Sequence, residues 1–242
     1  MNNSHIRPRV QNCLVCSSRV CCIFSGLDDS RLRELDQMQQ TSIYPAGAVV
    51  FIEGDWPRGV YCLCSGRVKL STHSPDGRAV MVGIALAGDV LGVRSLLSGR
   101  PHDLTAESLE RAELKFIRKD DLLNFLSRNG DVSLRLAQKL SEELYEAYRG
   151  VRDMALKRSY ERLVELLLRF CQTHGEATPD GIRLRMDLSQ EELAEMIGAS
   201  RRSLTRALTR LKHLGVIECR RRSIIVCDKV ALENTVPLEN LF

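Results

Sequence analysis

The sequence contains no apolar run that approaches the roughly 18 residues needed to cross a bilayer, which argues against a membrane partner. Its first ten residues are polar and basic and lead into no apolar export signal, so we expect a cytoplasmic protein. The chain also lacks a nucleophile–base motif, a phosphate-cradling glycine loop and a metal-protease spacing, and we expect no enzyme. With 44% hydrophobic and 27% charged residues, the composition excludes wholesale disorder, and 242 residues suit one large domain or two modest ones.

One basic segment stands out against a mildly acidic remainder. Residues 200–222 hold seven arginines and one lysine against one glutamate, a net charge of +7, whereas the whole chain carries +4 and the remainder therefore −3. Such a concentration of positive charge is the usual electrostatic footprint of a nucleic-acid binder.

Two short helices are predicted in and just before this basic segment. Ser189 and Glu192 fit a capping box that begins the first helix, and Gly198 ends it. Ser200 is expected to cap the second helix, over residues 201–213. Two helices joined by a glycine-containing turn form a helix-turn-helix, whose second helix enters the major groove of DNA.

The second helix separates into an apolar face, with Leu204, Leu208 and Leu211, and a basic face. Residues 216–219 and 223–227 are expected to follow as a two-stranded wing, whose basic tip would contact phosphates. Charge alone would equally fit an ordinary helical pair with a solvated face, but caps, glycine and wing together favour DNA binding. The residues expected to contact DNA are Ser200, Arg201, Arg202, Thr205, Arg206, Thr209, Arg220, Arg221 and Arg222.

The upstream sequence predicts a β-roll followed by a long helix. Glycine-punctuated β-rich runs between Thr41 and Ile117 indicate an antiparallel barrel or roll. Residues 131–154 then carry an apolar stripe at helical spacing, which we interpret as a dimer helix rather than one packed on its own barrel, because it exceeds what a small barrel can cover. The stripe consists of Leu134, Leu136, Leu140, Leu144, Tyr148 and Val151.

We therefore expect an α+β protein in four parts. These are a cysteine-rich arm (1–27), an antiparallel β-roll of the cyclic-nucleotide-binding type (28–127), a dimerisation helix (128–157) and a winged helix-turn-helix (158–242).

The order of these parts resembles the CRP/FNR family of bacterial transcription regulators. The resemblance covers about residues 20–230 and is carried by Gly54-Asp55, residues 61–66, Gly88-Asp89 with Gly92, and residues 193–206. It implies a homodimer that reads a two-fold symmetric operator and works with RNA polymerase.

The resemblance also assigns roles within the recognition helix. Arg206 matches the family's arginine that reads guanine, and Thr205 matches the serine before it in the FNR branch. Arg202 falls where the family usually has a glutamate that accepts a hydrogen bond from cytosine. Since an arginine cannot accept one, the usual half-site is not implied here.

The family's roll often holds cyclic AMP, through a Gly-Glu pair and an Arg-Ser pair. Here Val93 falls at the glutamate, and His102-Asp103-Leu104 occupies the Arg-Ser region. Because an aspartate would repel the phosphate, we expect no cyclic nucleotide.

The chain has nine cysteines, an odd number that argues against a secreted disulfide framework. Cys13, Cys16 and Cys22 follow the spacing C-x2-C-x5-C. This segment is similar to the oxygen-sensing FNR branch, in which such cysteines hold a 4Fe–4S cluster. By that resemblance, these three residues bind the cluster, and the signal is oxygen, nitric oxide or cellular redox state.

The fourth ligand is left open, because the family's position for it falls on Leu114. Candidates are Cys21, Cys62, Cys64, or an aspartate or histidine, and Cys62 and Cys64 would share one face of a strand. The alternatives to a cluster are a zinc site, a thiol–disulfide switch and an arm without a cofactor. A regulator gated instead by a small molecule in the roll is a further alternative.

Overall fold

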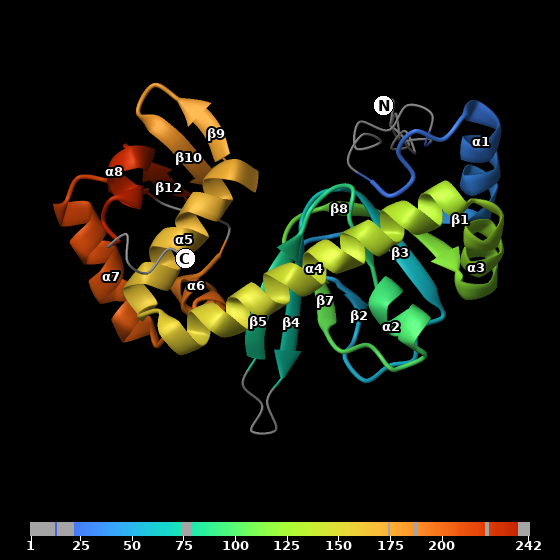
Figure 1. Ribbon diagram of the computed structural model, residues 1–242, viewed down its shortest axis with the longest axis horizontal. Coiled ribbons are helices and arrows are strands. Elements are labelled where there is room, and N and C mark those ends of the chain that lie inside the picture. Colours follow the sequence, from blue (N-terminus) through green and yellow to red (C-terminus); the bar gives the residue numbers. More distant parts are fainter. Residues whose placement is uncertain are drawn as a thin grey trace, which may run out of the picture. The chain divides into compact units, whose positions relative to one another are not determined.

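The computed structural model describes Cys13 and residues 22–73, 79–173, 175–185, 188–220 and 223–236 (Figure 1). Cys16, Cys21, Arg221 and Arg222, named above, lie outside these residues. The chain divides into two compact units, one formed by residues 1–79 and 83–143 and the other by residues 80–82 and 144–242. Within the described part, no helix combines the length and the apolarity that crossing a membrane requires.

The first unit is built on two four-stranded sheets, of order β1-β8-β3-β6 and β2-β7-β4-β5 (Figure 1). The registered strand pairs are antiparallel, which confirms the predicted roll. Its strands are β1 (Gln39–Tyr44), β2 (Val49–Phe51), β3 (Gly59–Ser65), β4 (Val68–His73), β5 (Ala79–Ala85), β6 (Val90–Leu91), β7 (Thr105–Ser108) and β8 (Ala112–Arg118). A short helix, α2 (Val93–Ser98), follows β6.

The alternation of side chains along β3 and β8 gives this sheet two different faces. Leu63 lies opposite Leu114, and both are buried in one core cluster of the roll. Cys62 lies opposite Lys115 in the next pair of the same register. Since successive residues of a strand point to opposite faces, Cys62 and Lys115 face away from that cluster.

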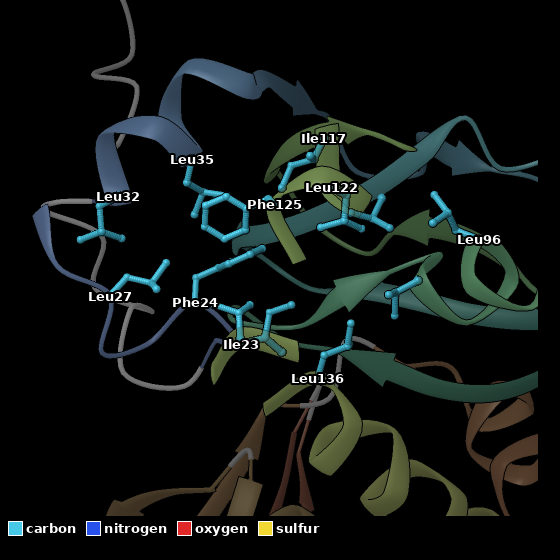
Figure 2. Packing of buried hydrophobic residues seen from close by; sticks show 13 residues of the cluster. Ile23, Phe24, Leu27, Leu32, Leu35, Leu96, Ile117, Leu122, Phe125 and Leu136 are labelled. Atoms are coloured by element: carbon cyan, nitrogen blue, oxygen red, sulfur yellow. The ribbon is translucent and has the colours of Figure 1, made fainter. Parts of the chain in front are cut away.

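A second hydrophobic core covers this other face. It joins the end of the arm to α1 (Asp29–Met38), α3 (Lys119–Arg128) and the start of α4 (Gly130–Leu156). Ile23 and Phe24 from the arm lie among residues of these helices, including Phe125 and Leu136 (Figure 2). The ring of Phe24 meets that of Phe125 edge-on, with 6.1 Å between the centroids. The segment that follows the predicted cysteine motif is therefore anchored in a core.

Helix α4 is 27 residues long, and the residues of its predicted apolar stripe lie in two different environments. Leu136 and Leu140 pack into the second core of the roll, so for them the alternative of a helix packed on its own barrel is correct. Leu134, Leu144, Tyr148 and Val151 are exposed on the single chain.

The second unit is a helical layer with a small sheet of order β11-β12-β10-β9. Helix α5 packs against α7, α8 and the hairpin β9–β10. The elements are α5 (Ser159–Thr173), β9 (Gly175–Thr178), β10 (Gly181–Arg185), α6 (Gln190–Met196), α7 (Arg201–His213), β11 (Ile217–Arg220), β12 (Ser223–Val226) and α8 (Lys229–Glu233). The predicted wing is thus two strands of a larger sheet.

Candidate functional sites: a recognition helix and a cysteine pocket

The helix-turn-helix begins with the predicted capping box. The Ser189 hydroxyl accepts a hydrogen bond from the Glu192 backbone N–H at 3.1 Å, and the Glu192 carboxylate accepts one from the Ser189 N–H at 2.9 Å. Gly198 follows the C-cap of this helix with a φ of +56°, a left-handed conformation that residues with a side chain adopt only under strain. Local chemistry therefore fixes the start of α6 and the turn behind it.

Helix α7 is capped at its N-terminus by Ser200, whose hydroxyl accepts a hydrogen bond from the Ser203 N–H at 3.2 Å. Its inner face consists of Leu204, Leu208 and Leu211, all buried as predicted. These three leucines pack one face of the helix against the rest of the unit, while the other face points to solvent.

The exposed face of α7 carries the side chains that the sequence suggested for DNA contact. Arg202, Arg206 and Thr209 recur at helical spacing and are exposed. Arg210, in contrast, lies over the ring of Tyr160 at 4.4 Å from its centroid. The other described members of the predicted set, namely Ser200, Arg201, Thr205 and Arg220, are exposed too.

The wing presents one described arginine, Arg220 of β11. Its guanidinium pairs with Glu218 at 2.9 Å and with Asp180 of the β9–β10 turn at 3.2 Å. A phosphate that binds Arg220 therefore competes with two exposed carboxylates, whose pairing is worth little in water.

A single arginine of α5 holds the turn between α6 and α7. Arg162 donates through Nε to the carbonyl of Ile197 at 2.7 Å and through Nη2 to that of Gly198 at 3.2 Å. Its Nη1 donates to the carbonyl of Lys157, beyond the end of α4, at 2.6 Å. No local pattern in the sequence predicts this role, because the two carbonyls that Arg162 holds in the turn are 35 and 36 residues away along the chain.

A second site lies where the arm meets the outer face of the sheet. Its hollow is lined by residues of the arm, α1, β3 and β8, including all the described cysteines of the first unit: Cys13, Cys22, Cys62 and Cys64. The structure thus brings two of the three predicted cluster ligands and both predicted strand cysteines to one pocket.

Cys13 is held at this pocket by polar contacts. Its backbone N–H donates to both oxygens of Asp36, at 3.1 and 3.2 Å, and its thiol donates to the Gln39 side-chain oxygen at 3.2 Å. The ammonium of Lys115, a residue 3% exposed, donates to Asp36 at 3.1 Å and to the sulfur of Cys13 at 3.4 Å. Sequence reasoning predicted the cysteines of this site but missed Lys115, whose signal was a lysine between the apolar residues Leu114 and Phe116.

Two thiols of the pocket, those of Cys13 and Cys62, have raised pKa values. Burial raises the pKa of Cys13 to about 12, against the opposing effect of Lys115. Burial and the neighbouring Cys64 raise the pKa of Cys62 well above its ordinary value. Both residues are thiols at neutral pH, and binding a metal would release their protons.

The described residues alone do not form a finished metal site. Among them, no group of three or more His, Cys, Asp or Glu side chains is placed to hold an ion together. The donor set nonetheless suits iron, because cysteine thiolates are the ligands of iron–sulfur clusters and a buried lysine beside them offsets negative charge.

Each unit of the fold contains a stretch of sequence that matches a known protein family. Residues 42–129 match the model of a cyclic nucleotide-binding domain, and residues 161–235 match that of a Crp-like helix-turn-helix domain. The global nitrogen regulator of Synechocystis sp. is 32% identical over 185 residues, which cover 76% of this chain and 82% of that protein. The chain belongs to the CRP/FNR family of transcription regulators.

Other CRP/FNR proteins are similar over most of the chain. The CRP-like cAMP-activated global transcriptional regulator of Mycobacterium tuberculosis is 28% identical over 210 residues, covering 87% of this chain and 94% of that protein. The structure of FixK2 from Bradyrhizobium japonicum matches with a TM-score of 0.72 at 22% identity, covering 81% of this chain and 96% of that one. The predicted fold class is confirmed, and this CRP/FNR chain is a DNA-binding transcription regulator.

The structure also describes Gly92, His102 and Asp103 of the roll, the region in which the sequence suggested that cyclic nucleotide is not bound. His102 is buried, and its ring stacks on Phe51 at 4.0 Å between centroids. The carboxylate of Asp103 pairs with the guanidinium of Arg94, in α2, at 2.8 Å. A Cβ at Gly92 would come within 2.9 Å of the His102 ring, so histidine and glycine fit one another closely.

Proposed function

We propose that this CRP/FNR regulator is a homodimer that reads a two-fold symmetric operator and senses oxygen, nitric oxide or redox state through a 4Fe–4S cluster. Cys13, Cys16 and Cys22 would hold the cluster. The observation that carries the proposal is the pocket in which Cys13 and Cys22 meet two strand cysteines and the buried Lys115.

The dimer rests on the exposed side of α4. Leu144, Tyr148 and Val151 are 55%, 68% and 69% exposed and follow one another at steps of four and three residues. Apolar residues at this spacing form the seam of a two-stranded coiled coil. A second copy of α4 offers a seam of the same chemistry, and two parallel copies would present a pair of α7 helices to successive half-sites about one DNA turn apart.

The end of the arm contacts α4, so a change at the cluster can be transmitted to this helix. The backbone carbonyl of Ile23 accepts a hydrogen bond from Arg135 of α4 at 2.9 Å, and Ile23 and Phe24 share a core with Leu136. Cluster loss would change the packing of the arm against the first turns of this helix. A small rotation of the dimer helices then alters the presentation of the recognition helices.

Three polar residues around Cys13 would support cluster binding. Asp36 and Gln39 position Cys13, and Lys115 offsets the negative charge of bound thiolates. When bound, the cluster supplies an oxidant-sensitive iron centre. We further propose that the roll takes no cyclic nucleotide, because Asp103 and the buried His102 replace phosphate-binding groups.

The proposal is tested by purifying the protein without oxygen and measuring visible absorption, iron, acid-labile sulfide and zinc before and after exposure to air. A brown protein with stoichiometric iron and sulfide that bleaches in air supports it. A protein that takes up no iron, even after reconstitution, contradicts it, and stoichiometric zinc would then indicate the zinc alternative.

A matched pair of variants connects the cofactor with regulation. The triple variant Cys13→Ser, Cys16→Ser and Cys22→Ser should lose the cluster and the response of DNA binding to air. Cys227→Ser removes an exposed thiol of the other unit and should retain both. If regulation survives the triple variant, a small molecule bound in the roll becomes the better explanation of the signal.

A further inference from the structure

We propose that Cys62 of β3 is the fourth thiolate ligand of the cluster, and that Lys115, its cross-strand neighbour, stabilises the ligated state. This inference rests on the proposed function, since it names the residue that completes the same site.

The position where the family places its fourth ligand does not face the arm in this chain. Leu114 is 1% exposed and lies in the core cluster that also contains Leu63, Val68 and Ala106. A ligand for the arm cysteines must instead come from the opposite face of the same sheet.

Cys62 occupies that opposite face at the required place. It lies directly across from Lys115 in the β3–β8 pair, one step from the Leu63–Leu114 pair. It packs against the same hydrophobic cluster as Cys13 and Cys22, and all three line one pocket. Two cysteines of the arm and one of β3 thus line a common space.

Cys64 is less suited to this task, although it lines the same pocket. The register of β3 against β8 shifts between Leu63 and Ser65, so Cys64 sits at an irregularity of the strand. Its thiol donates to the backbone carbonyl of Cys62 at 3.7 Å. Cys64 is also buried and, unlike Cys62, does not belong to the cluster shared by Cys13 and Cys22.

Lys115 supplies a positive charge inside the proposed cluster site. A cluster bound by four thiolates carries net negative charge, and burying such charge is costly unless a cation is close. The Lys115 ammonium is already inside the site, 3.4 Å from the Cys13 sulfur, and Asp36 keeps it in place at 3.1 Å. Each cysteine that binds iron releases its thiol proton to solvent, so no oxidant or reductant is needed for ligation.

The test is anaerobic reconstitution of the full chain with sulfide and equal amounts of ferrous and ferric iron, which match the mean oxidation state of the cluster, comparing wild type with Cys62→Ser and Cys64→Ser. Iron and sulfide per chain, visible absorption and the reduction potential of any cluster are measured. We expect Cys62→Ser to lower cluster occupancy by at least about tenfold, or to retain a cluster of shifted potential and spectrum, because ligand loss exceeds the 10–100-fold effect of second-sphere changes. Cys64→Ser should match wild type in all four measurements.

Two controls keep the outcomes distinct. Cys62→Ala and Cys64→Ala retain a small apolar group in the pocket, and urea unfolding of their apo forms shows whether a loss of cluster is merely a loss of fold. A folded Cys62 variant with wild-type iron, spectrum and potential overturns this inference while leaving the sensor intact. A wild-type protein without iron overturns the inference together with the proposed function.

Discussion

Arg162 in α5 donates a 2.7 Å hydrogen bond to the backbone carbonyl of Ile197, the residue that ends α6. The same guanidinium reaches the carbonyls of Gly198 and Lys157. Helix ends leave such carbonyls without partners inside the helix, and a cation there also complements the helix dipole. One side chain therefore holds both the turn of the helix-turn-helix and the connection that follows α4.

Replacing Arg162 should weaken the DNA-binding unit. For Arg162→Gln we expect a loss of about 1.5–3 kcal/mol in the free energy of unfolding, the usual worth of hydrogen bonds to a charged group. Urea unfolding measures this change. Arg169→Gln is the matched control, because Arg169 is exposed and its ion pair with Glu146 is worth at most about 1 kcal/mol. Equal effects of the two substitutions would show that the turn does not depend on Arg162.

Arg206 and Arg210 differ in their surroundings although they share one helix and one charge. Arg206→Ala should reduce operator affinity by about 1–3 kcal/mol and relax the base preference at one position of each half-site. Arg210→Ala should instead affect stability, since Arg210 lies on Tyr160. Binding titrations against the operator and random DNA separate the two. Equal loss of affinity for both DNAs in Arg206→Ala would refute base reading by this residue.

The exposed seam of α4 predicts how the dimer can be broken. Tyr148→Glu places a charge in the seam and should shift the protein to monomers, with a large loss of operator affinity, while each chain remains folded. Sedimentation at several concentrations measures the association. Glu142→Gln also changes one charge but lies on the opposite side of the helix, and it should leave the dimer intact. A dimeric Tyr148→Glu protein would place the interface elsewhere.

Some parts of this fold are predictable from local sequence because their determinants are local. Ser189, Glu192, Gly198 and Ser200 act within a few residues of themselves, and the structure has α7 over the predicted residues 201–213. The apolar stripe of α4 was predictable too, but its division was not. Leu136 is buried against the roll and Val151 is exposed, because only the first part of α4 packs on the roll.

Other parts depend on partners that are distant in the sequence. The hairpin β9–β10 is short and polar, and β10 is stabilised by pairing with β12, about forty residues later along the chain. Likewise, Cys62 and Lys115 become neighbours only through the register of β3 with β8. The sequence named the four cysteines of the pocket as candidate ligands, but no spacing rule places Lys115 beside them, so that part of the site had to come from the structure.

The surroundings of Cys13 in the pocket control the reactivity of its thiol. Asp36 and Lys115 carry opposite charges, so replacing each of them should have opposite effects on this reactivity. Asp36 raises the pKa of the Cys13 thiol, Lys115 lowers it, and burial contributes the largest increase. Because the thiolate is the form that reacts, Asp36→Asn should speed alkylation of Cys13 by iodoacetamide at pH 8, and Lys115→Met should slow it. Mass spectrometry of quenched samples measures the rate at each cysteine, with the exposed Cys227 as the internal reference. If both substitutions speed the reaction, loosening of the arm rather than charge controls access to Cys13.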